Sequence, residues 1–128
     1  MRSILIVDDD RECRNQMAEI FIDAGYEVTA TGSVAKAIHG ILKKLAQVVV
    51  LGTKCDELTA ADLIPIMKRC NPRVPIILVA ADISLGLLRK LRDEGIFYYA
   101  LKPVNAEDRQ EVRQAVNCAF ENLGLHPA

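Results

Sequence analysis

The chain has 128 residues, of which 51% are hydrophobic, and its formal net charge is −1. This length suits one domain with a buried core. No stretch gathers five or more basic residues, so the sequence shows no basic patch that would indicate binding to nucleic acid or to an acidic membrane. No apolar run approaches the roughly 18 residues of a membrane helix, and the N-terminus lacks the apolar segment of a signal peptide. We therefore expect a cytoplasmic protein.

Residues 3–7 form an apolar run without polar alternation, which is typical of a parallel strand covered on both faces. Asp8, Asp9 and Asp10 follow it directly. In open parallel sheets, ligands bind at the carboxyl ends of the strands, so these acids form a candidate site. Carboxylates that lie close together resist joint ionisation unless a cation or a lysine is near. In a simpler interpretation, Asp9 or Asp10 caps the next helix.

Apolar runs and segments of helical periodicity alternate along the rest of the chain. Capping residues such as Ser33, and glycines such as Gly25, Gly95 and Gly124, mark where the helices begin and end. The expected strands are 3–7, 26–30, 48–51, 76–79 and 96–101. The expected helices are 11–24, 34–45, a segment after Thr59, 85–93 with Asp82 or Ser84 as cap, and a segment from Asn105 to Gly124.

Two of the expected helices contain a residue that disfavours helix. Pro65 lies in the third, which either begins late, so that Pro65 falls in its first turn, or is kinked. Gly86 weakens the fourth by roughly 1 kcal/mol relative to Ala, so this helix can be short or frayed.

The alternation predicts an α/β fold with a doubly wound, five-stranded parallel sheet in the order 2-1-3-4-5 and five helices. We expect one domain over residues 1–124 and a C-terminal tail over residues 125–128. The four cysteines lack the spacing of a zinc site and fit reduced thiols. They are Cys13, Cys55, Cys70 and Cys118.

The chain contains a series of motifs: ILIVDDD at residues 4–10, a strand ending at Leu51, Pro75-Ile76-Ile77, and Gly95 followed by Tyr99 and Lys102-Pro103. In their order and spacing, and across essentially the whole chain, these motifs resemble a bacterial response-regulator receiver domain, which has a flavodoxin-like fold. In that family, two acids after the first strand bind Mg²⁺ and an Asp at the end of the third accepts phosphate from a histidine kinase. A Ser or Thr after the fourth strand contacts the phosphoryl group, and a Lys after the fifth completes the pocket.

The resemblance implies that Asp8 and Asp9 are the acidic pair, that Lys102 is the pocket lysine, and that Tyr99 is the switch aromatic. The position of the phosphoacceptor holds Gly52, and the position of the hydroxyl holds Ala80. Glycine offers no nucleophile and alanine no hydroxyl, so ordinary phosphotransfer cannot occur at this site.

Two neighbouring residues are candidates to replace the lost acceptor. Thr53 should point to the other face of the strand end and lacks a general base. Asp56 lies further into the loop, and a displaced acceptor at Asp56 stays open as an alternative. Without the acceptor carboxylate, we expect Lys102 to pair directly with Asp8 or Asp9, Mg²⁺ to bind weakly, and no cofactor to be required.

We expect a two-component or phosphorelay signalling domain that is not an enzyme and acts through contacts with a kinase, an effector or a second receiver. The resemblance implies an output face on the fourth helix, fifth strand and fifth helix, which dimerises or docks a partner. The alternative is a solvated charged surface. The charged residues of this face are Arg89, Lys90, Arg92, Glu107, Asp108 and Glu111, with Leu85 or Leu87 between them.

Two other functions, a phosphatase and a nucleotide-binding module, are alternatives to a signalling domain. Asp8 and Asp10 resemble the Asp-x-Asp of haloacid-dehalogenase-type phosphatases, but the chain lacks that family's later Ser or Thr and its second acidic pair. A nucleotide-binding flavodoxin-like module would need a Gly-rich loop before a helix, and none is present.

Overall fold

The computed structural model describes residues 2–125, so the predicted tail, apart from Leu125, lies outside the described residues. The main sheet is parallel throughout, in the order β2-β1-β3-β6-β7, which confirms the predicted topology. Its strands are β1 (Ser3–Val7), β2 (Glu27–Thr31), β3 (Val48–Leu51), β6 (Ile76–Ala80) and β7 (Tyr98–Leu101).

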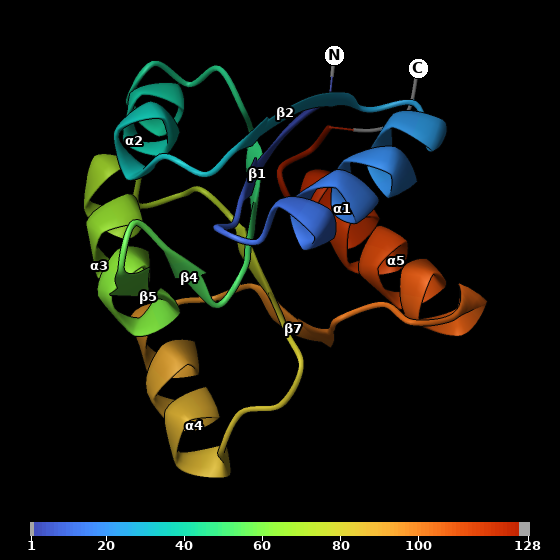
Figure 1. Ribbon diagram of the computed structural model, residues 1–128. Helices are drawn as coiled ribbons and strands as arrows, with labels where there is room; N and C mark the ends of the chain where they lie inside the picture. Colours follow the sequence, from blue (N-terminus) through green and yellow to red (C-terminus); the bar gives the residue numbers. More distant parts are fainter. Residues whose placement is uncertain (1, 126–128) are drawn as a thin grey trace.

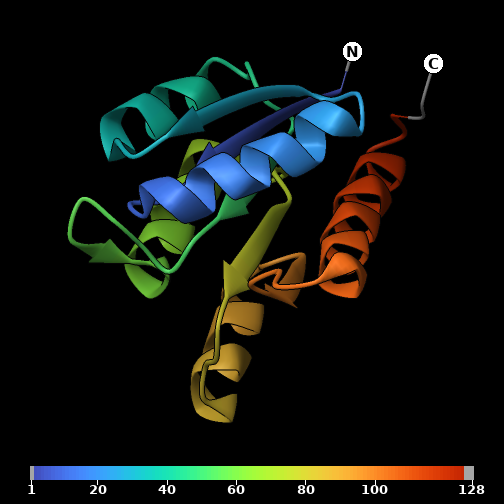
Figure 2. The same ribbon diagram turned by 45° about the vertical axis from the view of Figure 1, so that its right-hand side comes forward.

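The helices lie on both faces of the sheet, as a doubly wound fold requires (Figure 1). They are α1 (Arg11–Asp23), α2 (Val34–Leu42), α3 (Ala60–Cys70), α4 (Leu85–Glu94) and α5 (Ala106–Asn122). Helices α1 and α5 cover one face and α2 and α3 cover the other (Figure 2). Helix α4 extends the second layer toward the end of the molecule and buries Leu91 in it. None of the helices within residues 2–125 is long and apolar enough to cross a bilayer.

The core forms two layers because side chains alternate along each buried strand. In β1, Ile4 and Ile6 join the layer under α1 and α5, whereas Leu5 and Val7 join the layer under α2 and α3. The same alternation holds in β3 and β6, whose residues are all buried. This alternation decides which way the residues just beyond the strands point.

Side-chain caps begin the five helices, and most of them were predicted. Ser33 and Asn105 cap α2 and α5 as expected, and Ser84 rather than Asp82 caps α4. Thr59 and Asp62 form a reciprocal capping box at the start of α3. Because α3 begins at Ala60, Pro65 lies in its interior and not in its first turn.

The end of α2 differs from the prediction. The helix stops at Leu42, and the amides of Lys44 and Leu45 bond back to the carbonyls of Ile41 and Gly40, which is the Schellman pattern. Lys44 takes a left-handed φ of 54° there. Leu42 and Leu45, at the C-terminal end of the expected helix 34–45, are 57% and 62% exposed.

A short hairpin of β4 (Lys54–Cys55) and β5 (Leu58–Thr59) follows β3 and was not predicted. Its two turn residues, Asp56 and Glu57, have φ values of 49° and 66°. Positive φ at both central residues is the requirement of a type I′ turn, for which Asn-Gly is the usual sequence. The sequence therefore gave no hairpin signal here.

The strained turn predicts that Glu57→Gly stabilises the fold, because glycine removes the steric cost of a left-handed residue, which is about 1 kcal/mol. Glu111→Gly, at an exposed position inside α5, should instead destabilise by about 1 kcal/mol. Urea unfolding of both variants measures whether each substitution raises or lowers the free energy of unfolding. Equal destabilisation by both substitutions would contradict the strained turn.

Candidate functional site

Strand pairing brings Asp8 and Gly52 side by side at the carboxyl edge of the sheet. The register pairs Val7 with Leu51, and the amide of Gly52 donates to the carbonyl of Val7 at 2.8 Å. Asp8 continues the alternation of Ile4 and Ile6, and Gly52 continues that of Val48 and Val50 in the neighbouring strand. Both residues therefore face the same side of the sheet.

The Asp8 carboxylate lies in the space that a side chain at position 52 would need. A Cβ added at Gly52 would overlap Cγ and Oδ2 of Asp8 and would lie 2.8 Å from Oδ1. Asp8 is only 5% exposed, and its Oδ1 accepts a hydrogen bond from the amide of Asp10 at 3.0 Å. Gly52 thus has a local role that the sequence did not reveal: it leaves room for the neighbouring acid.

Asp9 is held by the hairpin that follows β3. Its amide donates to the carbonyl of Lys54 at 3.0 Å, and its Oδ1 accepts from the amide of Asp56 at 3.2 Å. The Asp56 carboxylate in turn accepts from the amide of Val34, the first residue of α2, at 2.8 Å. An acid at a helix N-terminus satisfies an otherwise unpaired amide and is favoured by the helix dipole.

Asp10 is the N-cap of α1, as the simpler interpretation of the acidic run proposed. Its Oδ1 accepts from the amides of Glu12 and Cys13. Arg14, which the sequence analysis did not single out, donates from Nη1 to the carbonyl of Asp8 at 2.8 Å. Its position one turn into α1 gave no signal of this contact, because the acceptor is a main-chain atom.

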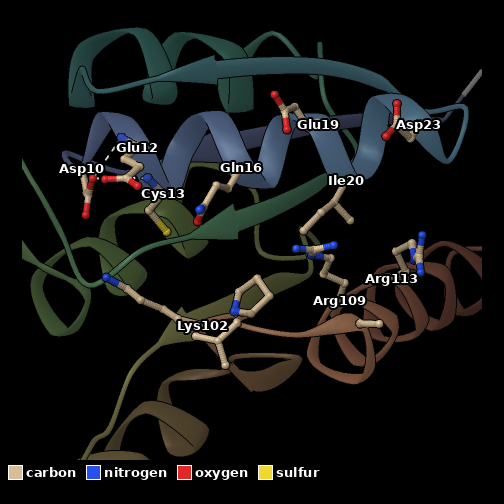
Figure 3. A pocket seen from close by; sticks show the side chains of 13 residues that line it. Asp10, Glu12, Cys13, Gln16, Glu19, Ile20, Asp23, Lys102, Arg109 and Arg113 are labelled. Atoms are coloured by element: carbon tan, nitrogen blue, oxygen red, sulfur yellow. Dashed lines mark hydrogen bonds between the residues drawn. The ribbon is translucent and has the colours of Figure 1, made fainter.

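In the described part of the chain, no hydrogen bond joins Lys102 to Asp8 or Asp9, where a direct pair was expected. Within residues 2–125, the hydrogen bonds to the Asp8 and Asp9 carboxylates come from main-chain amides, and none comes from Lys102. The amide of Lys102 donates to the carbonyl of Ala80, which ties the ends of β6 and β7 together. In Figure 3, its side chain extends toward the end of a groove where Asp10 and Cys13 lie.

That groove runs between α1 and α5 and has a volume of about 680 Å³. Figure 3 shows Arg109 reaching from α5 toward α1, close to Ile20. The two walls carry opposite charge, with acids on the α1 side and cations on the α5 side. The charged lining residues are Asp10, Glu12, Glu19, Asp23, Lys102, Arg109 and Arg113.

The remaining predicted residues separate into a buried group and an exposed one. Ala80 is fully buried, and Tyr99 is half-buried against the core layer under α2 and α3. On the predicted output face, Asp108 accepts from the amide of Val104 at 3.0 Å. The other five charged side chains of that face are exposed: Arg89, Lys90, Arg92, Glu107 and Glu111.

The acids do not fit a divalent cation well. Mg²⁺ needs oxygen ligands in near-octahedral geometry, but Asp8 is turned toward Gly52 and Asp9 accepts a hydrogen bond from the hairpin. Across residues 2–125, no group of three or more His, Cys, Asp or Glu side chains is assembled to hold a metal ion.

Residues 4–122 match the family model described as the response regulator receiver domain. The chain belongs to this family. The receiver domain is 26% identical to Sporulation initiation phosphotransferase F of Bacillus subtilis (strain 168), covering 88% of this chain and 89% of that protein. It is 27% identical to the DNA-binding transcriptional regulator NtrC of Bradyrhizobium sp. (strain RP501 Parasponia), over 83% of this chain but only 22% of that protein.

Solved structures agree on the fold of the receiver domain. A response regulator receiver domain protein from Clostridium thermocellum matches with a TM-score of 0.85 at 22% identity, covering 97% of this chain and 98% of that one. The beryllofluoride-activated NtrC4 receiver domain dimer matches with a TM-score of 0.82 at 21% identity, covering 95% and 98%. At these identities the structures establish the fold alone.

The contact between Asp8 and Gly52 predicts that Gly52→Ala destabilises the receiver domain by about 1–3 kcal/mol, the usual cost of overpacking. In an Asp8→Ala background the same substitution should cost much less, because the overlapping carboxylate is gone. Urea unfolding of the wild type, both single variants and the double variant measures this coupling. Purely additive effects would show that the carboxylate does not fill the space.

Buried thiols predict a loss of stability in alkaline solution. Burial, reinforced by the Asp8 carboxylate, raises the pKa of Cys13 from 9.0 to about 11. The unfolded state loses this proton first, so the contribution of Cys13 is complete below pH 9 and is lost as the pH rises toward 11. The free energy of unfolding should fall less steeply over this range in Cys13→Ala than in Cys118→Ala, whose thiol is exposed. Parallel pH profiles would contradict the assignment.

Proposed function

We propose that this receiver domain transmits its signal through protein contacts without accepting a phosphoryl group. The observation that carries the proposal is the Asp8 carboxylate, which fills the space beside Gly52 where an acceptor side chain would stand. Ala80 adds to it, because a methyl group cannot hydrogen-bond a phosphoryl oxygen. Weak or absent Mg²⁺ binding follows from the same arrangement of acids, and no cofactor is required.

The engagement of Asp56 argues against a displaced phosphoacceptor. Its Oδ2 accepts from the amide of Val34, and its own amide donates to Asp9. A nucleophilic carboxylate must reach a near-attack geometry, and leaving this position would unpair the start of α2. Likewise, the bonds of Asp10 to Glu12 and Cys13 disfavour the role of acid/base that a phosphatase would require.

The face of α4, β7 and α5 is the surface we assign to partner contacts. Strand β7 is at the edge of the sheet, so one side of its main chain has no neighbouring strand. Several large apolar side chains are exposed around it, which favours an interaction surface over a solvated charged surface. They are Leu85, Phe97, Tyr98, Leu101 and Val104.

We propose a second copy of the receiver domain as the partner on this face. The exposed cations of this face lie on α4 and its exposed acids lie on α5, so two copies related by a two-fold axis can bring opposite charges together. The dimeric structure of the NtrC4 receiver is a precedent for association within the family. A kinase or an effector would use other parts of the surface, such as the charged groove between α1 and α5.

Incubation with acetyl phosphate and Mg²⁺, followed by intact-mass measurement, tests the absence of phosphorylation. The wild type should keep its mass. The Gly52→Asp, Ala80→Thr double variant is the positive control, since it restores both phosphoryl-handling groups, although Asp8 must first rotate away. A gain of one phosphoryl group by the wild type would overturn the proposal, and mapping would then begin at Asp56.

Light scattering over a range of concentrations tests the dimer. The wild-type mass should rise toward twice that of the monomer, and Leu101→Lys should remain monomeric because it buries a charge in the interface. Leu42→Lys is the matched control, because Leu42 is similarly exposed but lies on α2. A monomer mass that does not depend on concentration would rule out this dimer.

A further inference from the structure

A cavity of about 330 Å³ lies between the start of α3, the end of β6 and the first turns of α4. It is separate from the charged groove and lies on the opposite face of the sheet from the Asp8 carboxylate. Its size falls within the range of small-molecule sites. The lining residues are Thr53, Thr59, Ala60, Ala61, Leu78, Ala80, Ile83, Leu87 and Leu91.

Small side chains leave this space open. Ala60 and Ala61 occupy the first two positions of α3, and Ala80 ends β6. The resemblance to other receivers places a Ser or Thr at position 80. The alanine that removes the phosphoryl contact therefore also makes the cavity wall apolar.

The chemistry of the lining restricts what can bind. None of the lining side chains carries a charge, so a charged ligand would lose its hydration without compensation. The Thr59 hydroxyl is already bonded to Asp62. Thr53 is exposed at the rim of the cavity, and no hydrogen bond within residues 2–125 uses its hydroxyl, so this group is accessible to a ligand.

One wall of the cavity is a loosely held helix. Leu91 is the only residue of α4 (Leu85–Glu94) that is fully buried. Leu87 lines the cavity but is 36% exposed, and Gly86 lies beside it in the first turn. A molecule in the cavity would add contacts between α4 and the sheet, and so would favour one position of that helix.

We propose that this cavity is a binding site for a small, neutral, largely apolar molecule with one hydrogen-bonding group, which bonds the Thr53 hydroxyl. Binding stabilises α4 against the sheet and thereby acts on the face proposed for partner contacts. The ligand thereby sets the position of α4. The site itself does not depend on whether the domain accepts phosphate.

Titration with indole and with indene, followed by amide chemical shifts, tests the proposal. The two probes have nearly the same shape, and only indole carries an N–H donor. Saturable shifts should be confined to the lining segments, namely residue 53, residues 59–61 and residues 78–91. Indole should also slow hydrogen exchange of the α4 amides, because the helix gains contacts. Absence of saturable shifts with both probes, or unchanged exchange in α4, would overturn the proposal.

Three variants locate the site. Ala61→Leu fills the cavity and should weaken indole binding about tenfold or more, whereas Ala35→Leu, on the exposed surface of α2, should leave it unchanged. Thr53→Val keeps the shape but removes the hydroxyl, so it should weaken indole by roughly fivefold and leave indene unaffected. Equal affinity in Ala61→Leu and Ala35→Leu, or equal responses of the two probes to Thr53→Val, would contradict the assigned site. These experiments contain no phosphodonor, so their failure is distinct from a failure of the phosphorylation test.

Discussion

The close approach of Asp8 to Gly52 organises the carboxyl edge of the sheet. Parallel pairing of β1 with β3 places the two residues in register and on one face. The carboxylate can turn into that space only because position 52 has no Cβ. A buried carboxylate needs hydrogen bonds, and Asp8 obtains one from the amide of Asp10 at the start of α1. The first acidic residue thus joins β1, β3 and α1 instead of facing a ligand.

The other acids at this edge of the sheet also accept hydrogen bonds from the main chain. Asp9 holds the β4–β5 hairpin, Asp10 caps α1, and Asp56 satisfies the first amide of α2. Each carboxylate therefore accepts a hydrogen bond from the main chain. Metal binding or phosphotransfer would compete with such bonds, which supports the proposal that this receiver domain works without that chemistry.

Much of the fold could be predicted from the sequence, because the signals are local. Apolar runs located the strands, and Ser33 and Asn105 marked helix starts through their own hydrogen bonds. The hairpin was missed because Asp56 and Glu57 adopt left-handed φ without the glycine that normally reports it. The end of α2 at Leu42 was missed for a related reason, since a lysine and not a glycine takes the left-handed position that follows the helix.

The site was only partly predictable. Aligning the motifs with the family located Asp8, Gly52, Ala80 and Lys102, but not how they interact. The expected pair between Lys102 and an acid rested on charge alone, whereas the hydrogen bonds to the Asp8 and Asp9 carboxylates come from main-chain amides. The direction in which the Asp8 side chain turns depends on the register of β1 and β3 and on the space left by the missing Cβ of Gly52. Neither can be predicted from the sequence of one segment alone.

A crystal structure of the wild type grown in excess magnesium chloride would show whether the Asp8 carboxylate gives up its place beside Gly52 to bind a metal. We predict that the carboxylate remains against Gly52, bonded to the amide of Asp10, with no metal between Asp8 and Asp9. An ordered Mg²⁺ held by both carboxylates, with Asp8 turned away from Gly52, would contradict it.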